Sequence, residues 1–216
     1  MFQIPSKTSN KIIDVQNVYA AKNIELSEIA QDIITYQSVH TAHLNIDLVM
    51  NELYKVLANS EVYDTIMTGA LIDTAALTPD LADRLPGHFK TLVHKLQIDY
   101  SGYGIDEQLG IAIAKQYGSI SEASFGDLDN NKFGVAKKLD TTKGNTILDD
   151  ITLGIISAVS GKIARKYGTD VITSKQVASD YALIVNHKVV AEGDNAEDIA
   201  SLNRSVYHNL GIVRKF

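Results

Sequence analysis

Two pairs of adjacent acidic residues stand at the beginning of apolar segments, and they are the residues of this chain best suited to chemistry. Asp149 and Asp150 lie near the start of ILDDITLGIISAVSG, which is otherwise uncharged and rich in small residues. Asp106 and Glu107 open the apolar part of YGIDEQLGIAIA in the same way. Because an uncompensated buried charge is costly, such a pair must be hydrated, used as a helix cap or bound to a metal ion. The repetition suggests one shared site.

Small residues on both predicted helices would let the two acidic pairs approach each other. Positions 154, 157 and 161 follow Asp150 on one helix face and hold glycine, serine and glycine, while positions 110 and 114 hold glycine and alanine. Two carboxylates about 4 Å apart repel each other by about 4 kcal/mol at an effective dielectric constant of about 20. A convergent cluster therefore calls for a cation or for raised pKa values. All-oxygen ligands favour hard ions, with Mg²⁺ as the first candidate and Mn²⁺ as the second.

The same acids have an interpretation that involves no ligand. Acidic side chains in the first turn of a helix are stabilised by the helix dipole and by free amide groups, so helix capping alone would explain each pair. The polar stretch 119–143 is expected to be a loop with one short helix, and it adds Asp129 and Lys132 between the two acidic pairs. Residue spacing alone leaves both interpretations open.

Composition excludes several other classes of protein. The chain has 216 residues, no cysteine and a formal net charge of -6, which argues against zinc-thiolate sites, cysteine nucleophiles and general nucleic-acid binding. The phosphate loops and the hydrolase motifs with fixed spacing do not occur. His40 and His43 are better explained as residues of a solvated helix end than as zinc ligands. No segment reaches the length of a transmembrane helix, so we expect a cytoplasmic protein.

The pattern of apolar residues predicts a mainly α protein with a small appendage. Spacing of three and four residues extends from about residue 11 to residue 167, which predicts a helical domain over 1–168 built from short helices. From residue 169 onward we expect a ββα appendage. In this appendage two β-branched strands flank an Asn186-His187 turn, and a helix follows from about Asn195 to Asn209. Exposed aliphatic helix faces favour a homo-oligomer, with a dimer as the simplest case.

Five short segments, taken together in their order and spacing, resemble the phosphatidylglycerophosphatase A family, and especially its soluble branch in Gram-positive bacteria with low-temperature-requirement-like proteins. They are TGALID at 68–73, YGIDE at 103–107, YGSI at 117–120, DNNK at 129–132 and LDDITLGIISA at 148–158. The resemblance covers approximately residues 25–167. It implies an all-helical fold, and the membrane-bound members of that family use Mg²⁺ to remove a phosphate from phosphatidylglycerophosphate.

The resemblance also implies roles for the acidic pairs. Asp106 and Glu107 match the acidic pair of the family, and Asp149 and Asp150 match its D-D-I motif. These four residues are therefore the expected metal ligands. Asp149 and Asp150 are also expected to be catalytic.

Two other matches concern the phosphate. Asp129 and Lys132 match the D-x-x-K-P motif, although Phe133 replaces its proline, and both are expected to be catalytic. Thr68 and Gly69 match a Thr/Gly turn, so they are expected to bind substrate together with Lys132. Because the chain lacks the membrane span of the lipid phosphatases, a soluble phosphate monoester is a plausible substrate beside the lipid.

The leading hypothesis is a Mg²⁺-dependent phosphatase in (phospho)lipid metabolism that hydrolyses phosphatidylglycerophosphate or a soluble analogue. Its nucleophile is either a metal-activated water or one of the aspartates. The alternative is a non-enzymatic helical protein that binds a metal or phosphate for regulation, or a structural oligomer whose acids only cap helices. Peripheral attachment to a membrane remains open in either case.

Overall fold

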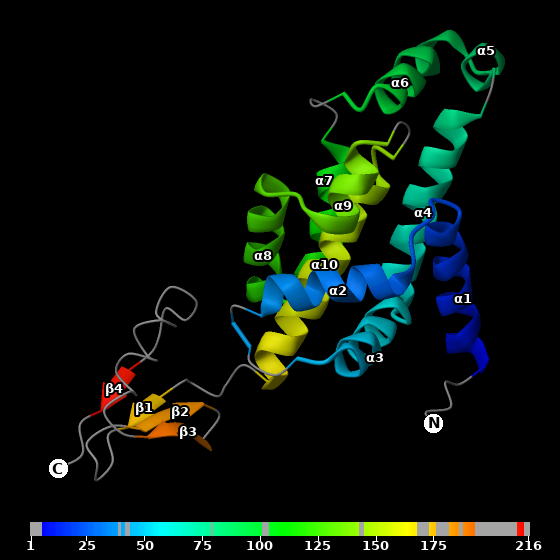
Figure 1. Cartoon of the computed structure of the whole chain (residues 1–216). Helices are drawn as coiled ribbons and strands as arrows, with labels where there is room; N and C mark the ends of the chain where they lie inside the picture. Colours follow the sequence, from blue (N-terminus) through cyan, green and yellow to red (C-terminus); the bar gives the residue numbers. More distant parts are fainter. Residues whose placement is uncertain are drawn as a thin grey trace. The chain divides into compact units, whose positions relative to one another are not determined.

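The computed structural model describes residues 6–38, 40–41, 44–78, 80–100, 104–142 and 145–167, together with the strand residues 173–175, 182–185, 188–192 and 211–213. Within these residues the chain forms a series of helices followed by four short strands (Figure 1), which confirms the mainly α prediction. The helices are α1 (Ser6–Ala20), α2 (Leu26–Gln37), α3 (Ile46–Leu57), α4 (Ser60–Leu77), α5 (Leu81–Arg84), α6 (Gly87–Gln97), α7 (Ile105–Lys115), α8 (Ser119–Asn130), α9 (Gly134–Asp140) and α10 (Leu148–Tyr167).

Contacts between residues divide the chain into two compact units. The first unit combines Met1–Thr35 with Asn45–Lys162, and the second combines Tyr36–Leu44 with Ile163–Phe216. The second unit thus begins at Ile163 and takes in a segment from the N-terminal half, whereas the sequence placed the start of the appendage at residue 169. All the acidic residues discussed above belong to the first unit.

The second unit contains a four-stranded sheet with the order β3-β2-β1-β4. Its strands are β1 (Thr173–Lys175), β2 (Ala182–Val185), β3 (Lys188–Glu192) and β4 (Gly211–Val213). Strands β2 and β3 pair antiparallel with Val185 opposite Lys188, which confirms the two predicted strands. The sequence did not predict β1 and β4, which pair in parallel. The turn at residues 186–187 and the helix expected at 195–209 lie outside the described residues.

Helix α10 forms the centre of the first unit. Every residue from Asn145 to Gly161 is buried. From Ile151 onward the segment holds only apolar or small residues on all sides, and a helix of that kind has no face suited to water. Helix α1 reaches it through a 2.9 Å hydrogen bond between the hydroxyls of Tyr19 and Thr152. Among the described residues, no helix combines the length and the apolar character needed to span a bilayer.

Glycines bring α7 and α10 into contact through their main chains. A Cβ atom at Gly154 would collide with the carbonyl oxygen of Gly110, and one at Gly110 would collide with the carbonyl oxygen of Asp150 and the ring of Phe125. The small residues predicted to permit a close crossing therefore do so. This crossing brings the first turn of α10 beside α7.

The segment 119–143 is more regular than the sequence predicted. The expected loop with one short helix is in fact two helices, α8 and α9, which are separated by the short connection 131–133. The asparagines and aspartates that suggested turns are accommodated at the end of α8, where Asn130 and Asn131 donate side-chain hydrogen bonds to carbonyl oxygens one turn back. Packing of Phe125 and Leu128 into the core outweighs the weak helix propensity of this stretch.

Substitution of Gly154 by alanine tests the close contact between α7 and α10. Its Cβ would meet main-chain atoms of Gly110, which cannot move aside as a flexible side chain could, so we expect Gly154→Ala to lower the free energy of unfolding by about 1–3 kcal/mol. Gly126→Ala on α8 is the matched control, because nothing lies within 4 Å of its Cβ position. It should stabilise the protein by about 0.5–1 kcal/mol through helix propensity. Urea unfolding of both variants is the measurement, and equal effects would contradict the contact.

Candidate metal and phosphate site

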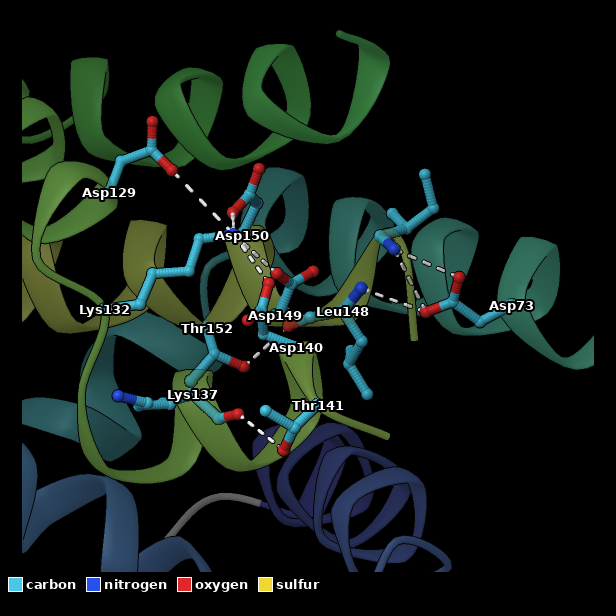
Figure 2. Close-up of polar contacts among 11 residues, drawn as sticks. Asp73, Asp129, Lys132, Lys137, Asp140, Thr141, Leu148, Asp149, Asp150 and Thr152 are labelled. Atoms are coloured by element: carbon cyan, nitrogen blue, oxygen red, sulfur yellow. Dashed lines mark hydrogen bonds and ion pairs between the residues drawn. The ribbon is translucent and has the colours of Figure 1, made fainter. Parts of the chain in front are cut away.

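Lys132 lies among four carboxylates from three parts of the chain. Its Nζ atom is 2.7 Å from Oδ2 of Asp149 and 2.8 Å from Oδ1 of Asp150, both on α10. Asp140 Oδ1 at the end of α9 is 3.5 Å away, and Asp129 Oδ1 on α8 is 3.9 Å away. Figure 2 shows these side chains directed toward the lysine. The structure thus brings Asp129 and Lys132 together with the D-D pair, as the sequence predicted.

Lys132 lies in the connection between α8 and α9, and a glycine with a positive φ follows this connection. Phe133 is extended, with φ -142° and ψ 176°, and Gly134 follows with a φ of +55°. A side chain at Gly134 would collide with the carboxylate of Asp32, which accepts a 2.7 Å hydrogen bond from the Val135 amide. Because proline holds φ near about -65°, this turn differs from one with proline at position 133. Lys132 nevertheless reaches the acids.

Asp73 on α4 supplies the cap of α10. Its buried carboxylate accepts hydrogen bonds from the main-chain amides of Ile147 (3.1 Å) and Leu148 (3.0 Å), as Figure 2 shows. Asp73 therefore serves as acceptor for two of the amides at the start of the helix, ahead of Asp149 and Asp150. The interpretation of Asp149 and Asp150 as caps of their own helix stays a prediction.

The acids of α7 approach the same end of α10. Single carboxylate oxygens of Asp106, Glu107 and Asp150 all lie within 4.8 Å of one another, so these three side chains could share one cation. Gly104 begins the helix in the left-handed conformation, with a φ of +66°, and this turn directs the first residues of α7 toward the cluster. Asp149 is not one of these three acids; its carboxylate contacts Lys132 instead.

Among the described residues, two oxygens of the cluster have neither a hydrogen bond nor an ion pair, and a third, Oδ1 of Asp150, has only its ion pair with Lys132. Oδ1 of Asp106 and Oδ1 of Asp149 are both buried, and neither accepts a hydrogen bond. A buried carboxylate oxygen without a partner is costly, and a bound cation would remove that cost. The residues present offer only oxygen atoms, which are the ligands that Mg²⁺ and Mn²⁺ prefer. The cluster therefore fits a hard divalent ion.

Burial and mutual repulsion change the protonation of the paired acids. Burial and then the charge of Asp150 raise the pKa of Asp149 to about 7. Burial raises the pKa of Asp150 to about 6, although Lys132 opposes the shift. For Lys132, burial lowers the pKa, but hydrogen bonds and charges from Asp149 and Asp150 outweigh burial, so its pKa is raised and it stays charged. Burial also raises the pKa of Asp106. These shifts show that one lysine does not compensate all the carboxylates.

The sequence analysis missed three acidic residues that belong to this region. Asp73 caps α10, Asp140 contacts Lys132, and Asp99 follows α6 close enough to change the pKa of Asp106 by its charge. Asp73 stands alone in the apolar helix segment ALIDTAAL, which is a usable indication of a buried polar role. Asp99 and Asp140 resemble ordinary surface acids in the sequence, and only the fold brings them here.

Thr68 and Gly69 are placed in the middle of α4 rather than in a turn. The exposed Thr68 hydroxyl donates a 2.7 Å hydrogen bond to the Asp64 carbonyl of its own helix. Gly69 is buried, and a side chain there would collide with Ile147 and Ile151. The predicted turn at these positions is wrong, and their geometry fits helix packing, so it gives no support to a role in substrate binding. His40 is exposed, and His43 lies outside the described residues.

Comparisons with known proteins identify relatives of this chain. No family model matches it. The uncharacterized protein YutG of Bacillus subtilis (strain 168) is 34% identical over 148 residues, which are 67% of this chain and 85% of YutG. The crystal structure of ypjQ from Bacillus subtilis, described as family-model DUF64, has a TM-score of 0.65 and 28% identity, covering 74% of this chain and 96% of that one. The low temperature requirement C protein from Listeria monocytogenes has a TM-score of 0.62 and 25% identity, covering 76% and 99%.

The raised pKa values of Asp149 and Asp150 predict how the stability of the metal-free protein depends on pH. Both carboxyls hold their protons more tightly in the folded chain than at the ordinary value of 3.8. Their contribution to stability is therefore fully present below that value and is lost as pH rises through about 6 and about 7. We expect the double variant Asp149→Asn, Asp150→Asn to lose less stability than the wild type over this range, by on the order of 3 kcal/mol.

Urea unfolding of chelator-treated protein at several pH values measures this difference. The matched control is Asp64→Asn with Asp127→Asn, which removes the same formal charge from exposed positions and should follow the wild type. Parallel pH profiles for the wild type and the Asp149, Asp150 double variant would contradict the assignment.

Proposed function

We propose that this chain, which belongs to the protein family of Bacillus subtilis YutG, is a Mg²⁺-dependent phosphatase that hydrolyses a phosphate monoester. The main support is the convergence of buried carboxylates with unpartnered oxygens beside Lys132. A hard cation and a lysine next to each other provide two positive partners for a phosphate group. The resemblance of the sequence segments to phosphatidylglycerophosphatase A adds the reaction class.

In this proposal the residues divide between metal and phosphate. Asp106, Glu107 and Asp150 would hold the ion, with Asp149 as a further ligand beside Lys132, and the ion would supply neutralisation of phosphate charge and polarisation of the reacting oxygen atoms. Ion pairs with Asp129 and Asp140 hold the side chain of Lys132 in position. When substrate binds, a phosphate oxygen replaces some of these contacts. Because hydrogen bonds and charges from Asp149 and Asp150 raise its pKa, Lys132 stays charged.

Two routes to phosphate release remain within the proposal. In the first, Asp129, a third of whose side chain is exposed, accepts a proton as the oxygen of a water molecule bonds to phosphorus; the bond from phosphorus to the ester oxygen breaks, and the alcohol takes its proton from solvent. In the second, a carboxylate oxygen of Asp149 bonds to phosphorus as the bond to the ester oxygen breaks, the alcohol takes its proton from solvent, and water then hydrolyses the aspartyl phosphate to phosphate and the free carboxylate. Single-turnover reaction with labelled substrate distinguishes them, because only the second route transfers label to the protein.

We further propose that the protein acts in the cytoplasm on a soluble phosphate ester or on a lipid ester reached from the membrane surface. The absence of cysteine from the sequence agrees with a reducing compartment. A homo-oligomer is part of the same proposal, because Leu71 and other large apolar side chains on helices are exposed.

Isothermal calorimetry with Mg²⁺ tests the metal site directly. We expect the wild type to bind the ion and Asp106→Asn or Asp150→Asn to weaken binding by at least about tenfold, because each change removes a charged ligand. Asp127→Asn, an exposed acid on α8, is the control and should bind as the wild type does. If both Asp106→Asn and Asp150→Asn bind Mg²⁺ as tightly as the wild type, the site is disproved.

Kinetics of Lys132→Met test the phosphate assignment. Loss of the positive charge should reduce kcat/KM for phosphate release by about 100-fold or more, whereas Lys115→Met on the exposed side of α7 should have no effect. Circular dichroism in Mg²⁺ checks that the variant is folded. Mg²⁺ binding without hydrolysis of any phosphate ester by the wild type would instead favour the regulatory alternative, and full activity of Asp149→Asn, Asp150→Asn would exclude the catalytic roles of these acids.

A further inference from the structure

A polar pocket lies beside the acidic cluster, between the end of α6 and the segment that leads from α9 into α10. Its volume is about 280 Å³, and its lining includes Asp99, Asp140, Asn145 and three threonines. That volume is slightly below the range of about 300–1,000 Å³ found for pockets that bury drug-sized ligands. The pocket suits a small molecule or one part of a small molecule.

The threonines of this pocket present acceptors rather than donors. Thr141 donates its hydroxyl proton to the carbonyl of Lys137 (3.0 Å), as Figure 2 shows, and Thr142 donates to the carbonyl of Lys138 (2.7 Å). Thr146 donates to the carbonyl of Leu96. A hydroxyl has a single proton, so while these bonds are kept each of these oxygens offers a ligand an acceptor.

Asn145 adds an acceptor that has no partner. Its Nδ2 group donates to the Thr142 carbonyl (3.1 Å), which fixes the orientation of the amide. Its Oδ1 atom is buried and accepts no hydrogen bond among the described residues, and the residue as a whole is 3% exposed. An amide oxygen in this situation is stabilised when a ligand supplies an O–H or N–H donor.

Asp140 connects this pocket with Lys132, the residue proposed to bind phosphate. Asp140 lines the pocket, and its Oδ1 atom lies 3.5 Å from Nζ of Lys132. Asp99 lines the pocket as well, and Lys132 acts on its pKa through charge. A molecule that placed a phosphate at Lys132 would therefore extend the rest of its structure toward these acceptors.

We propose, on the basis of the phosphatase function above, that this pocket holds the alcohol part of the substrate and selects a small polyhydroxylated alcohol, such as a sugar or polyol phosphate. Each hydroxyl group of such an alcohol supplies one hydrogen-bond donor. These donors match the neutral and charged acceptors that line the pocket. An acyl or alkyl chain would leave these acceptors without partners, which makes such esters poor substrates. Thr141 and Thr142 determine this specificity.

The test compares phosphate release from four esters by the Mg²⁺-loaded full chain: sorbitol 6-phosphate, n-hexyl phosphate, phosphoethanolamine and micellar phosphatidylglycerophosphate. We expect kcat/KM for sorbitol 6-phosphate to exceed each of the others by at least about tenfold. In the double variant Thr141→Val, Thr142→Val this preference should fall to about threefold or less, chiefly through a higher KM. Thr65→Val removes a hydroxyl with the same bond to its own helix and should keep the preference.

Three outcomes would overturn the inference while leaving the phosphatase function intact. They are hexyl phosphate or the lipid ester as the better substrate, a preference for phosphoethanolamine, and an unchanged sorbitol preference in the threonine double variant. If no ester is hydrolysed, calorimetry of sorbitol 6-phosphate and hexyl phosphate binding decides the matter. Tighter binding of the polyol ester that depends on the two threonines supports the pocket without the phosphatase, and equal binding overturns it.

Discussion

The buried acidic pair on α10 is the constraint on which the rest of this site depends. Asp149 and Asp150 are adjacent, both side chains are almost fully buried, and their charges repel each other. Lys132 offsets part of this repulsion with contacts of 2.7 and 2.8 Å, but further carboxylates surround the same ammonium group. A fold selected only for stability would avoid such an excess of negative charge. This excess of negative charge is the main support for the cation site that we propose.

Elements that do not touch a ligand hold this unfavourable cluster together. Asp73 fixes the start of α10 from α4 through two main-chain hydrogen bonds. Asp32 on α2 accepts a hydrogen bond from α9 and so fixes the turn that follows Lys132. Each of these acids serves structure, whereas the acids of the cluster lack enough partners. The difference between satisfied and unsatisfied carboxylates separates the two roles better than burial does.

The sequence predicted the helical fold and the convergence of the acids because both leave local signs. Apolar spacing identified the helices, and small residues at 110 and 154 indicated a close crossing. Only one short helix was predicted in 119–143, where the structure has two, because Asn and Asp favour turns and only tertiary packing overrides that preference. Asp99 and Asp140 join the site through long-range contacts, which no spacing rule encodes. The strands β1 and β4 are three residues each, too short for a periodic pattern to be recognised.

The contact between Gly110 and Gly154 also governs how rigid the cluster is. Side chains that separate two helices can change rotamer, and the distance between the helices then fluctuates. Here main chain rests directly on main chain, and there is no rotamer to change. The spacing between the acids of α7 and those of α10 is thus preorganised, and little conformational entropy is left to lose when a ligand with strict geometry binds.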